Sequence, residues 1–268
     1  MVKAAVAGIG GRMGSRIAQI LFETEGIELI GGVERPGHAA VGRDIGSLAG
    51  LQPCGIVVDD AVEAVLARCH VLIDFTAPEA SLKHMEKAAA SGTAMVVGTT
   101  GFTSAHMEKI RELTQKMPCV LAPNMSVGVN VLFKVIRDLT RLLGPGYDVE
   151  IVEAHHRFKK DAPSGTALRL AEAVAEARGR SLQEVGLYER HGVIGERPQE
   201  AIGLQTVRGG DVVGEHTVFF LGMGERIEVT HRAHSRDNFA RGAVAAAKWV
   251  IGKPAGLYSM QDVLGIAG

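Results

Sequence analysis

Short apolar runs alternate with amphipathic stretches through the first half of the chain. Residues 2–8 and 27–33 have the continuous apolar character of buried strands, and residues 12–23 between them have the spacing of an amphipathic helix. Further apolar runs lie at residues 56–59, 71–75, 94–97 and 119–122, and helical patterns at 78–90 and 104–116 separate the later ones. Strands that alternate with helices form parallel sheets covered on both faces, so this half predicts a doubly wound parallel sheet.

The pattern changes after Met125. A long helical stretch at residues 127–143 ends at Gly144-Pro145-Gly146, a strong stop signal, and an alternating strand follows at 147–155. The later expected elements are an amphipathic helix at 164–177, strand-like runs at 202–207, 215–221 and 226–230, and an Ala-rich helix at 239–251 that is able to return to the first domain. The predicted fold class is α/β, with a doubly wound parallel-sheet (Rossmann-type) dinucleotide-binding domain and a second α+β domain built on a mixed or antiparallel sheet.

Charge and cysteine content exclude several classes of protein. Lys plus Arg number 29 and Asp plus Glu number 30 in 268 residues, so no overall field directs the chain to nucleic acid or a membrane surface. Cys54, Cys69 and Cys119 lack CxxC or zinc-like spacing, which argues against a disulfide framework and a metal site. Arg12 and Arg16 interrupt the first apolar run, unlike a signal peptide, and no apolar stretch has the length of a membrane span. We therefore expect a soluble cytoplasmic protein with no metal, membrane or nucleic-acid partner.

A glycine turn lies between the first predicted strand and the first predicted helix. Gly8, Gly11 and Gly14 allow a tight turn and a close approach of backbone amides to a pyrophosphate, which the helix dipole also attracts. Glu34 stands at the end of the second strand, where an acidic residue binds the adenosine ribose of NAD. Arg35 follows it, where a guanidinium pairs with the 2′-phosphate of NADP. These residues predict NADH or NADPH as cofactor; the alternatives are a turn that binds nothing and a solvated Glu34–Arg35 ion pair.

Two later turns, at residues 98–101 and 122–125, are expected at the carboxyl ends of further strands. Ligands of open parallel sheets bind beyond those ends. Small and hydroxylated residues in these turns are therefore candidates to line the nicotinamide half of the cofactor, with a purely structural role as the alternative.

The densest group of chemically active side chains lies in residues 153–166, between a strand end and a helix start. Alternation along the strand sends His155 and His156 to opposite faces, so we expect different roles for them. Histidine is the natural acid or base near neutral pH, and Lys159 supplies a positive charge and a transferable proton. Ser164 is the expected N-cap of the next helix, whose first amides would bind a carboxylate together with these cations. The alternative is one packed histidine and several surface cations.

The motifs occur in the order seen in dihydrodipicolinate reductases, and the sequence resembles that family over essentially its whole length. The resemblance is carried by residues 8–14 with their Gly-Arg-Met-Gly core, Asp74-Phe75-Thr76, residues 98–101, residues 123–130, residues 155–166 and Ser235-Arg236. It implies a dinucleotide-binding domain of residues 1–126 plus 236–268, and a substrate-binding and oligomerisation domain of residues 127–235. It also implies reduction of the small dicarboxylate 4-hydroxy-tetrahydrodipicolinate to tetrahydrodipicolinate, in diaminopimelate and lysine biosynthesis, by a homotetramer.

The resemblance further implies roles for individual residues. His155 and Lys159 match the family's proton-handling pair, so hydride transfer to the conjugated cyclic imine would be followed by protonation through them. The matching substrate-binding positions are His156, Gly165 and Thr166. The matching cofactor contacts are Gly8, Ile9, Gly10, Gly11, Arg12, Met13, Glu34, Arg35, Gly98, Thr99, Thr100, Ala122, Pro123, Asn124 and Met125. The family accepts NADH, NADPH or both; one departure is Ser15, where many members carry Arg, and Arg16 is the neighbouring cation.

Two other functions stay open from the sequence alone. An aspartate-semialdehyde dehydrogenase needs a nucleophilic cysteine, and Cys119 lies in an apolar strand without a partner motif. A non-enzymatic NAD(P)-sensing regulator needs no proton donors, so the loop at 153–166 argues against it.

Overall fold

The computed structural model describes residues 1–266 of the chain. These residues form two compact units, one of Met1–Val127 with the segment that begins at Asp237, and one of Gly128–Arg236. No helix within residues 1–266 is both long enough and apolar enough to cross a membrane. The roles expected for the two domains, dinucleotide binding for one and substrate binding and oligomerisation for the other, stay a prediction.

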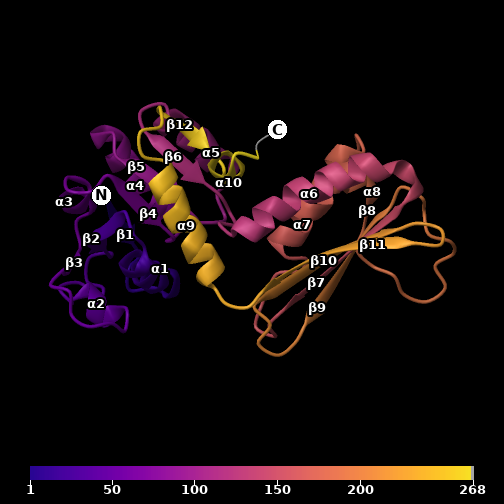
Figure 1. Cartoon of the computed structure of the whole chain (residues 1–268), viewed down its shortest axis with the longest axis horizontal. Coiled ribbons are helices and arrows are strands. Elements are labelled where there is room, and N and C mark those ends of the chain that lie inside the picture. The colour runs from indigo at the N-terminus through magenta and orange to yellow at the C-terminus, as the bar shows by residue number, and fades with distance from the viewer. Residues whose placement is uncertain (267–268) are drawn as a thin grey trace. The chain divides into compact units, whose positions relative to one another are not determined.

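The first unit is built on one parallel sheet of seven strands (Figure 1). In spatial order the strands are β12 (Gly256–Tyr258), β6 (Pro118–Leu121), β5 (Ala94–Val97), β4 (Val71–Asp74), β1 (Val2–Ala7), β2 (Ile27–Val33) and β3 (Val58–Asp59). Every pair of neighbours in this sheet is parallel, which confirms the predicted doubly wound architecture. The carboxyl ends of the strands therefore share one edge, where the predicted turns lie.

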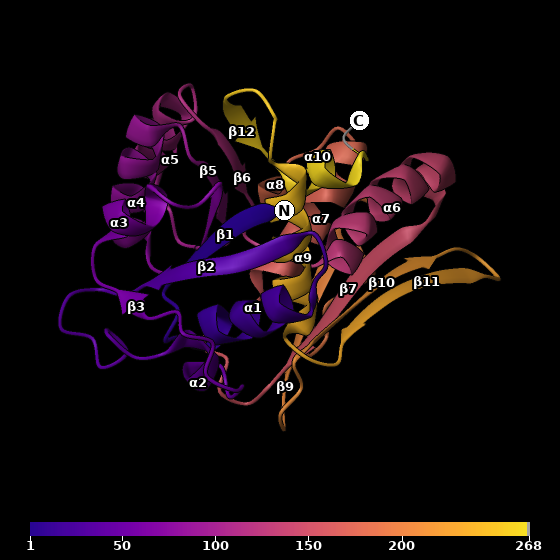
Figure 2. The same ribbon diagram turned by 60° about the vertical axis from the view of Figure 1, so that its left-hand side comes forward.

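Alternate residues of the inner strands face two separate cores. In β1, Ala4 and Val6 belong to a core shared with α1 (Arg12–Glu23) and α9 (Asp237–Trp249). Ala5 and Ala7 belong to the other core, which is covered by helices α3 (Val62–Leu66), α4 (Pro78–Ser91) and α5 (Ser104–Leu113). Figure 2 shows these two sets of helices on different sides of the sheet.

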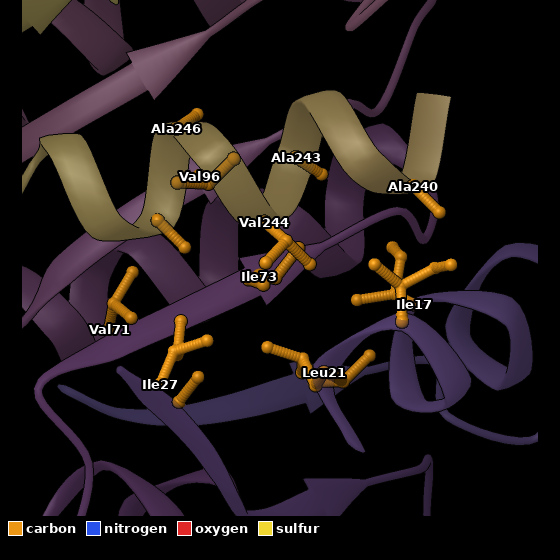
Figure 3. Close-up of a cluster of buried hydrophobic side chains, with 14 of the residues drawn as sticks. Ile17, Leu21, Ile27, Val71, Ile73, Val96, Ala240, Ala243, Val244 and Ala246 are labelled. Carbon is orange, nitrogen blue, oxygen red and sulfur yellow. The ribbon is translucent and has the colours of Figure 1, made fainter. Parts of the chain in front are cut away.

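Helix α9 is the Ala-rich helix predicted at residues 239–251, and it packs on the first unit as expected. Figure 3 shows Val244 of α9 beside Ile73 of β4, with Ile17 of α1 in the same cluster. Its small residues permit a close approach: a Cβ at Gly242 would lie 1.7 Å from the carbonyl oxygen of Met125. The helix is therefore held against the turn that follows β6.

The largest differences from the prediction concern short elements and helix ends. The strand predicted at 56–59 is reduced to Val58–Asp59, and the helix predicted at 104–116 ends at Leu113. The prediction lacks α2 (Ile45–Leu48), α3, α8 (Leu182–Val185), α10 (Met260–Leu264), β8 (Gly186–Leu187) and β12. Elements of two to five residues are too short for their hydrophobic period to be read.

The second unit has a mixed sheet of five strands in the order β11-β10-β7-β9-β8. Its longer strands are β7 (Asp148–His155), β9 (Ile202–Arg208), β10 (Gly214–Leu221) and β11 (Arg226–Ala233). β7 pairs in parallel with β9 and antiparallel with β10, which confirms the predicted mixed or antiparallel sheet. Helices α6 (Val127–Leu143) and α7 (Gly165–Ala177) share a core with one face of this sheet (Figure 1), and a single 3₁₀ turn (Gly144–Gly146) ends α6 at the predicted stop.

Candidate functional site

The glycine turn between β1 and α1 is as tight as the sequence predicts. Gly8 has a φ of +70°, its N–H donates to the carbonyl of Val33 at 2.9 Å, and Gly11 N–H donates back to the Gly8 carbonyl at 3.0 Å. A Cβ at Gly14 would lie 2.1 Å from the same Gly8 oxygen. Because Gly11 is the N-cap and offers no side chain, the first amides of α1 have no side-chain cap and are suited to an anion.

Glu34 is turned towards the glycine turn and does not form the surface ion pair with Arg35 that was the alternative. Its Oε1 accepts a hydrogen bond from the N–H of Gly10 at 3.0 Å. Within residues 1–266, Arg35 forms no ion pair. A cavity of about 720 Å³ is lined by Gly8, Gly11, Glu34 and Arg35 and by residues of α4 that include Lys83, His84 and Lys87. This cavity and the turn fit an adenine dinucleotide, whose ribose hydroxyls and phosphates need these donors and acceptors.

A buried carboxylate organises the strand end next to this cavity. Asp74, the last residue of β4, is completely buried and accepts hydrogen bonds from the N–H and Oγ1 of Thr76 (3.0 and 2.6 Å) and from Ser81 Oγ (2.9 Å). Its other oxygen lies 2.7 Å from Nδ1 of His84. Burial alone would raise the pKa of Asp74, but the bonds from His84 and the hydroxyls outweigh it and lower the pKa below its ordinary value. In the sequence, Asp74 is distinguished only as part of the Asp74-Phe75-Thr76 motif, and no local pattern indicates its role.

The two later predicted turns lie at the same edge of the sheet. Gly98 follows β5, and a Cβ there would lie 2.2 Å from the ring of Phe75, so any larger residue would have to displace that ring. Thr99 is buried and its Oγ1 accepts a hydrogen bond from the N–H of Thr76 at 3.0 Å, which ties this turn to the end of β4. Asn124 follows β6 and accepts a hydrogen bond from the N–H of Ser126 at 2.9 Å. The structure thus brings the predicted cofactor residues of the first unit to one edge.

In the second unit, His155 lies in a network of buried polar groups at the end of β7. Its Nδ1 is 2.6 Å from Oε2 of Glu153, and its ring meets the ring of His216 edge to face with centroids 5.2 Å apart. Glu153 also forms a salt bridge with Arg208 at 2.8 Å. Burial lowers the pKa of His155 and Glu153 partly restores it, while the positive charges of Lys159 and Arg208 lower it further. Neither Glu153 nor Arg208 was predicted to have a role, because their side chains meet only when β7 and β9 pair.

His156 and Lys159 have different surroundings from His155. The ring of His156 lies 6.2 Å from that of Phe158, and within residues 1–266 its buried Nδ1 has no hydrogen-bond partner. Separate neighbours for the two histidines agree with the alternation expected from the strand. Lys159 Nζ lies 2.8 Å from a carboxylate oxygen of Asp161, a partner that the sequence did not suggest.

The start of α7 confirms the predicted cap. The Ser164 side chain accepts a hydrogen bond from Ala167 N–H at 3.2 Å, so the helix begins at Gly165 as expected. Among the atoms of residues 1–266, none lies within 4 Å of a Cβ placed at Gly165, which leaves open space beside the first turn. The first amides of α7 and the loop that carries Lys159 belong to the same unit.

Cys119, the candidate nucleophile of the alternative dehydrogenase, lies in surroundings that do not suit that role. Cys119 is completely buried in β6, and burial raises the pKa of its thiol well above the ordinary value, which suppresses the thiolate that a nucleophile needs. Among residues 1–266, no three His, Cys, Asp or Glu side chains are grouped so that they could hold a metal ion.

The chain is similar to known proteins over its full length. The sequence profile described as "Dihydrodipicolinate reductase, N-terminus" matches residues 2–125, and the corresponding C-terminus profile matches residues 128–264. Relatives named 4-hydroxy-tetrahydrodipicolinate reductase from Syntrophobacter fumaroxidans and Citrifermentans bemidjiense are 60% and 57% identical over 266 residues, which cover 99% of this chain and 100% of each relative. The solved structure of a dipicolinate-bound dihydrodipicolinate reductase from Paenisporosarcina sp. TG-14 has the same fold, with a TM-score of 0.76 and 24% identity over 98% of both chains.

Proposed function

The chain belongs to the dihydrodipicolinate reductase family, and on that premise we propose that it reduces 4-hydroxy-tetrahydrodipicolinate to tetrahydrodipicolinate in diaminopimelate and lysine biosynthesis. The reaction consumes NADH or NADPH and one proton, and it releases NAD⁺ or NADP⁺, water and the reduced product. The observation that supports it most directly is the loop of residues 155–166, which combines a histidine, a lysine and a capped helix start.

The first unit supplies the cofactor site in this proposal. When bound there, NADH or NADPH supplies a hydride. The amides at the start of α1 hold the pyrophosphate, Glu34 binds the adenosine ribose, and Arg35 is available for a 2′-phosphate. The proposed contacts are Gly8, Ile9, Gly10, Gly11, Arg12, Met13, Glu34, Arg35, Gly98, Thr99, Thr100, Ala122, Pro123, Asn124 and Met125.

Arg16 already has partners, which hinders it from taking the role of the arginine that many family members carry at position 15. Its guanidinium forms a salt bridge with Asp237 at the start of α9 and a hydrogen bond with Gln19. A 2′-phosphate would therefore have to compete with Asp237 for Arg16, whereas Arg35 has no such competitor among residues 1–266. This difference favours Arg35 as the residue that reads the 2′-phosphate.

The second unit supplies the substrate site. His156, Gly165 and Thr166 bind the carboxylates of the substrate, for which the first amides of α7 provide donors. His155 and Lys159 deliver or relay the proton that the reduced substrate takes up, and the cations of the loop stabilise its negative charge. The bond between Lys159 and Asp161 has to open or be shared when the substrate arrives.

Two further expectations go with this function. We propose that the second unit also mediates assembly into a homotetramer, and that the enzyme works in the cytoplasm without nucleic-acid or membrane partners. Sedimentation equilibrium of the purified protein measures its oligomeric state, and a monomer or dimer would contradict the proposed homotetramer.

The function is tested by mixing the purified protein with NADH or NADPH and freshly prepared 4-hydroxy-tetrahydrodipicolinate. We expect a substrate-dependent loss of the near-ultraviolet absorbance of the reduced nicotinamide. Tight binding of NADH without turnover would favour the sensing regulator instead, and loss of turnover after thiol alkylation of the folded protein would favour a cysteine-dependent dehydrogenase.

A further inference from the structure

Glu153 is a carboxylate buried beneath the proposed proton-handling residue. Its side chain is 1% exposed, yet both oxygens are saturated with donors. Oε2 lies 2.6 Å from Nδ1 of His155 and accepts from Nη1 of Arg208 at 2.8 Å. Oε1 accepts from Nη2 of Arg208 at 2.8 Å, from the N–H of Ser164 at 3.0 Å and from Thr206 Oγ1 at 3.3 Å. A carboxylate with this many donors is held in one orientation.

The ring of His155 is held in place by contacts with Glu153 and His216. Glu153 fixes Nδ1, and the ring of His216 meets it at an interplanar angle of 75°. A Cβ at position 214 would lie 3.0 Å from Nε2 of His155, so the ring lies in the space that a side chain at residue 214 would occupy. Within residues 1–266, Nε2 makes no hydrogen bond. Nε2 is therefore the nitrogen left to meet another molecule.

The ionisation of Glu153 decides which nitrogen of His155 carries the hydrogen. Burial would raise the pKa of Glu153, but the bonds from Arg208, His155 and Ser164 lower it to about 2. An ionised carboxylate only accepts hydrogen bonds, so Nδ1 of His155 has to donate. Neutral His155 then has its hydrogen on Nδ1. A proton that the ring takes up therefore binds to Nε2, and a proton that it gives up leaves from Nε2.

The same carboxylate also fixes the start of α7. Ser164, whose N–H donates to Glu153, caps this helix and shares a hydrogen bond of 3.0 Å with Nε2 of His216. Gly165 and Thr166, the proposed substrate contacts, follow directly. His155 and the helix start are thus held by one group.

We propose that Glu153, held by Arg208, is a positioning residue that presents Nε2 of His155 to the substrate and sets the start of α7 relative to it. This inference rests on the proposed function for the identity of the substrate, but the arrangement of His155 can be measured without substrate. Glu153 itself touches no reacting atom; it acts through His155 and Ser164.

The substitution Glu153→Gln tests this role, because it keeps the shape and changes one acceptor into a donor. The donors Ser164 N–H, Thr206 Oγ1 and Arg208 Nη2 hold the amide oxygen at the Oε1 position. The NH₂ group then faces Nδ1 of His155 and favours the form of the ring that has its hydrogen on Nε2. A wrong tautomer of this kind lowers turnover by up to about 10⁴-fold in the Ser-His-Asp proteases.

The matched control is Glu150→Gln on the same strand. Glu150 is also held by two arginines, at 2.6 Å from Arg190 and 2.9 Å from Arg197, but no histidine of residues 1–266 bonds to it. Deleting its charge tests whether loss of any arginine-paired carboxylate from β7 has the same effect.

The tautomer is read from ¹⁵N chemical shifts of the histidine rings in protein without ligands, with His155→Ala used to assign the signal. We expect the Nδ1–H form for His155 in the wild type and in Glu150→Gln, and the Nε2–H form in Glu153→Gln. An Nε2–H ring in the wild type overturns the inference, even if Glu153→Gln does not fold. An Nδ1–H wild type without reductase activity would contradict the proposed function and leave the positioning role intact.

The pH profile of kcat adds a readout that a purely structural role would not move. The charged groups around His155 are Glu153, Lys159 and Arg208; His216 is neutral near pH 7, because burial lowers its pKa to about 4. Glu153 raises the pKa of His155 and Arg208 lowers it. If His155 is the acid, activity falls as pH rises through its pKa, so Glu153→Gln moves this limb to lower pH and Arg208→Gln moves it to higher pH.

We expect Glu153→Gln to reduce kcat by roughly 10²- to 10⁴-fold while the Kd of NADH stays within about twofold of the wild type. Glu150→Gln should keep its kcat. Shifts of the same sign for Glu153→Gln and Arg208→Gln, or equal losses of kcat in Glu153→Gln and Glu150→Gln, overturn the proposal.

Discussion

Replacing Asp74 by asparagine should weaken the first unit and its cofactor site together. Asp74 ends β4, is completely buried, and connects Thr76, Ser81 in the first turn of α4, and His84 one turn later. Asparagine has nearly the same shape but no charge, and it has one acceptor oxygen where aspartate has two. The amide oxygen will stay with Thr76 and Ser81, so the NH₂ group will face His84.

The size of the loss follows from the four shortest hydrogen bonds, which measure between 2.6 and 3.0 Å. A bond to a charged group contributes about 1.5–3 kcal/mol and a bond between neutral groups about 0.5–1.5 kcal/mol, so each bond loses about 1 kcal/mol. The total is about 4 kcal/mol, reduced because a buried amide costs less desolvation than a buried carboxylate. We expect Asp74→Asn to lower the free energy of unfolding of the first unit by about 2–4 kcal/mol.

Urea unfolding followed by tryptophan fluorescence measures this loss. The chain has one tryptophan, Trp249 at the end of α9, so the signal reports on the first unit. Asp59→Asn is the matched control, because Asp59 also ends a strand of this sheet but its side chain is 34% exposed. Its ion pair among residues 1–266 is with Arg68, so its loss should be at most about 1 kcal/mol. Equal losses in the two variants would refute the reasoning.

The pH dependence supplies a second check with a defined sign. The pKa of Asp74 is lowered in the folded state, so its contribution is fully present above the unfolded value, about 3.9, and fades as pH falls below it. The wild type should therefore lose its advantage over Asp74→Asn in acid. The NADH affinity of Asp74→Asn should also fall at neutral pH, because Thr76 and Thr99 lose their common anchor.

Three further substitutions test other parts of the molecule. Lys159→Ala should lower kcat by roughly 10²- to 10⁴-fold in steady-state assays and leave NADH binding unchanged, and near-normal turnover would contradict a role in proton handling. Arg35→Ala should weaken NADPH more than NADH by about 1.5–3 kcal/mol in fluorescence titrations, whereas equal losses would show that Arg35 does not read the 2′-phosphate. Gly14→Ala should abolish NADH binding or folding, since its Cβ would lie 2.1 Å from the Gly8 carbonyl oxygen. Gly146→Ala should behave as the wild type in the same titration, because its Cβ would meet no atom of the described residues within 4 Å.

Local sequence signals were sufficient for the long elements and for the glycine turn. The helix at residues 12–23 and the strand at 27–33 have the bounds that their hydrophobic patterns predict, and Ser164 caps α7 as its type and position indicate. Such features depend on neighbours in sequence, which is why they can be read there. The topology of the second sheet is different: β7 lies between β9 and β10, and nothing in the three strand patterns specifies that order.

The polar networks could not be predicted either, because they also depend on which strands pair. Arg208 reaches Glu153 across 55 positions in the sequence, and Thr99 reaches Asp74 across 25. Their residue types are common on protein surfaces, and only the paired strands bring them together. The signal that was available was the position of each acidic residue at or near the end of a predicted strand.

Asp74 and Glu153 show one physical solution in two units with unrelated topology. Each carboxylate lies at or near the carboxyl end of an inner strand, bonds Nδ1 of a histidine, and ties that strand to the start of the following helix, through Ser81 in α4 or Ser164 at the cap of α7. A shift of either helix start would leave a buried charge short of donors, and breaking such a group costs about 3–5 kcal/mol. The strand ends that carry the proposed ligand contacts are therefore held in place before any ligand binds. Binding then costs less conformational entropy than it would on a loop held by solvent-exposed contacts.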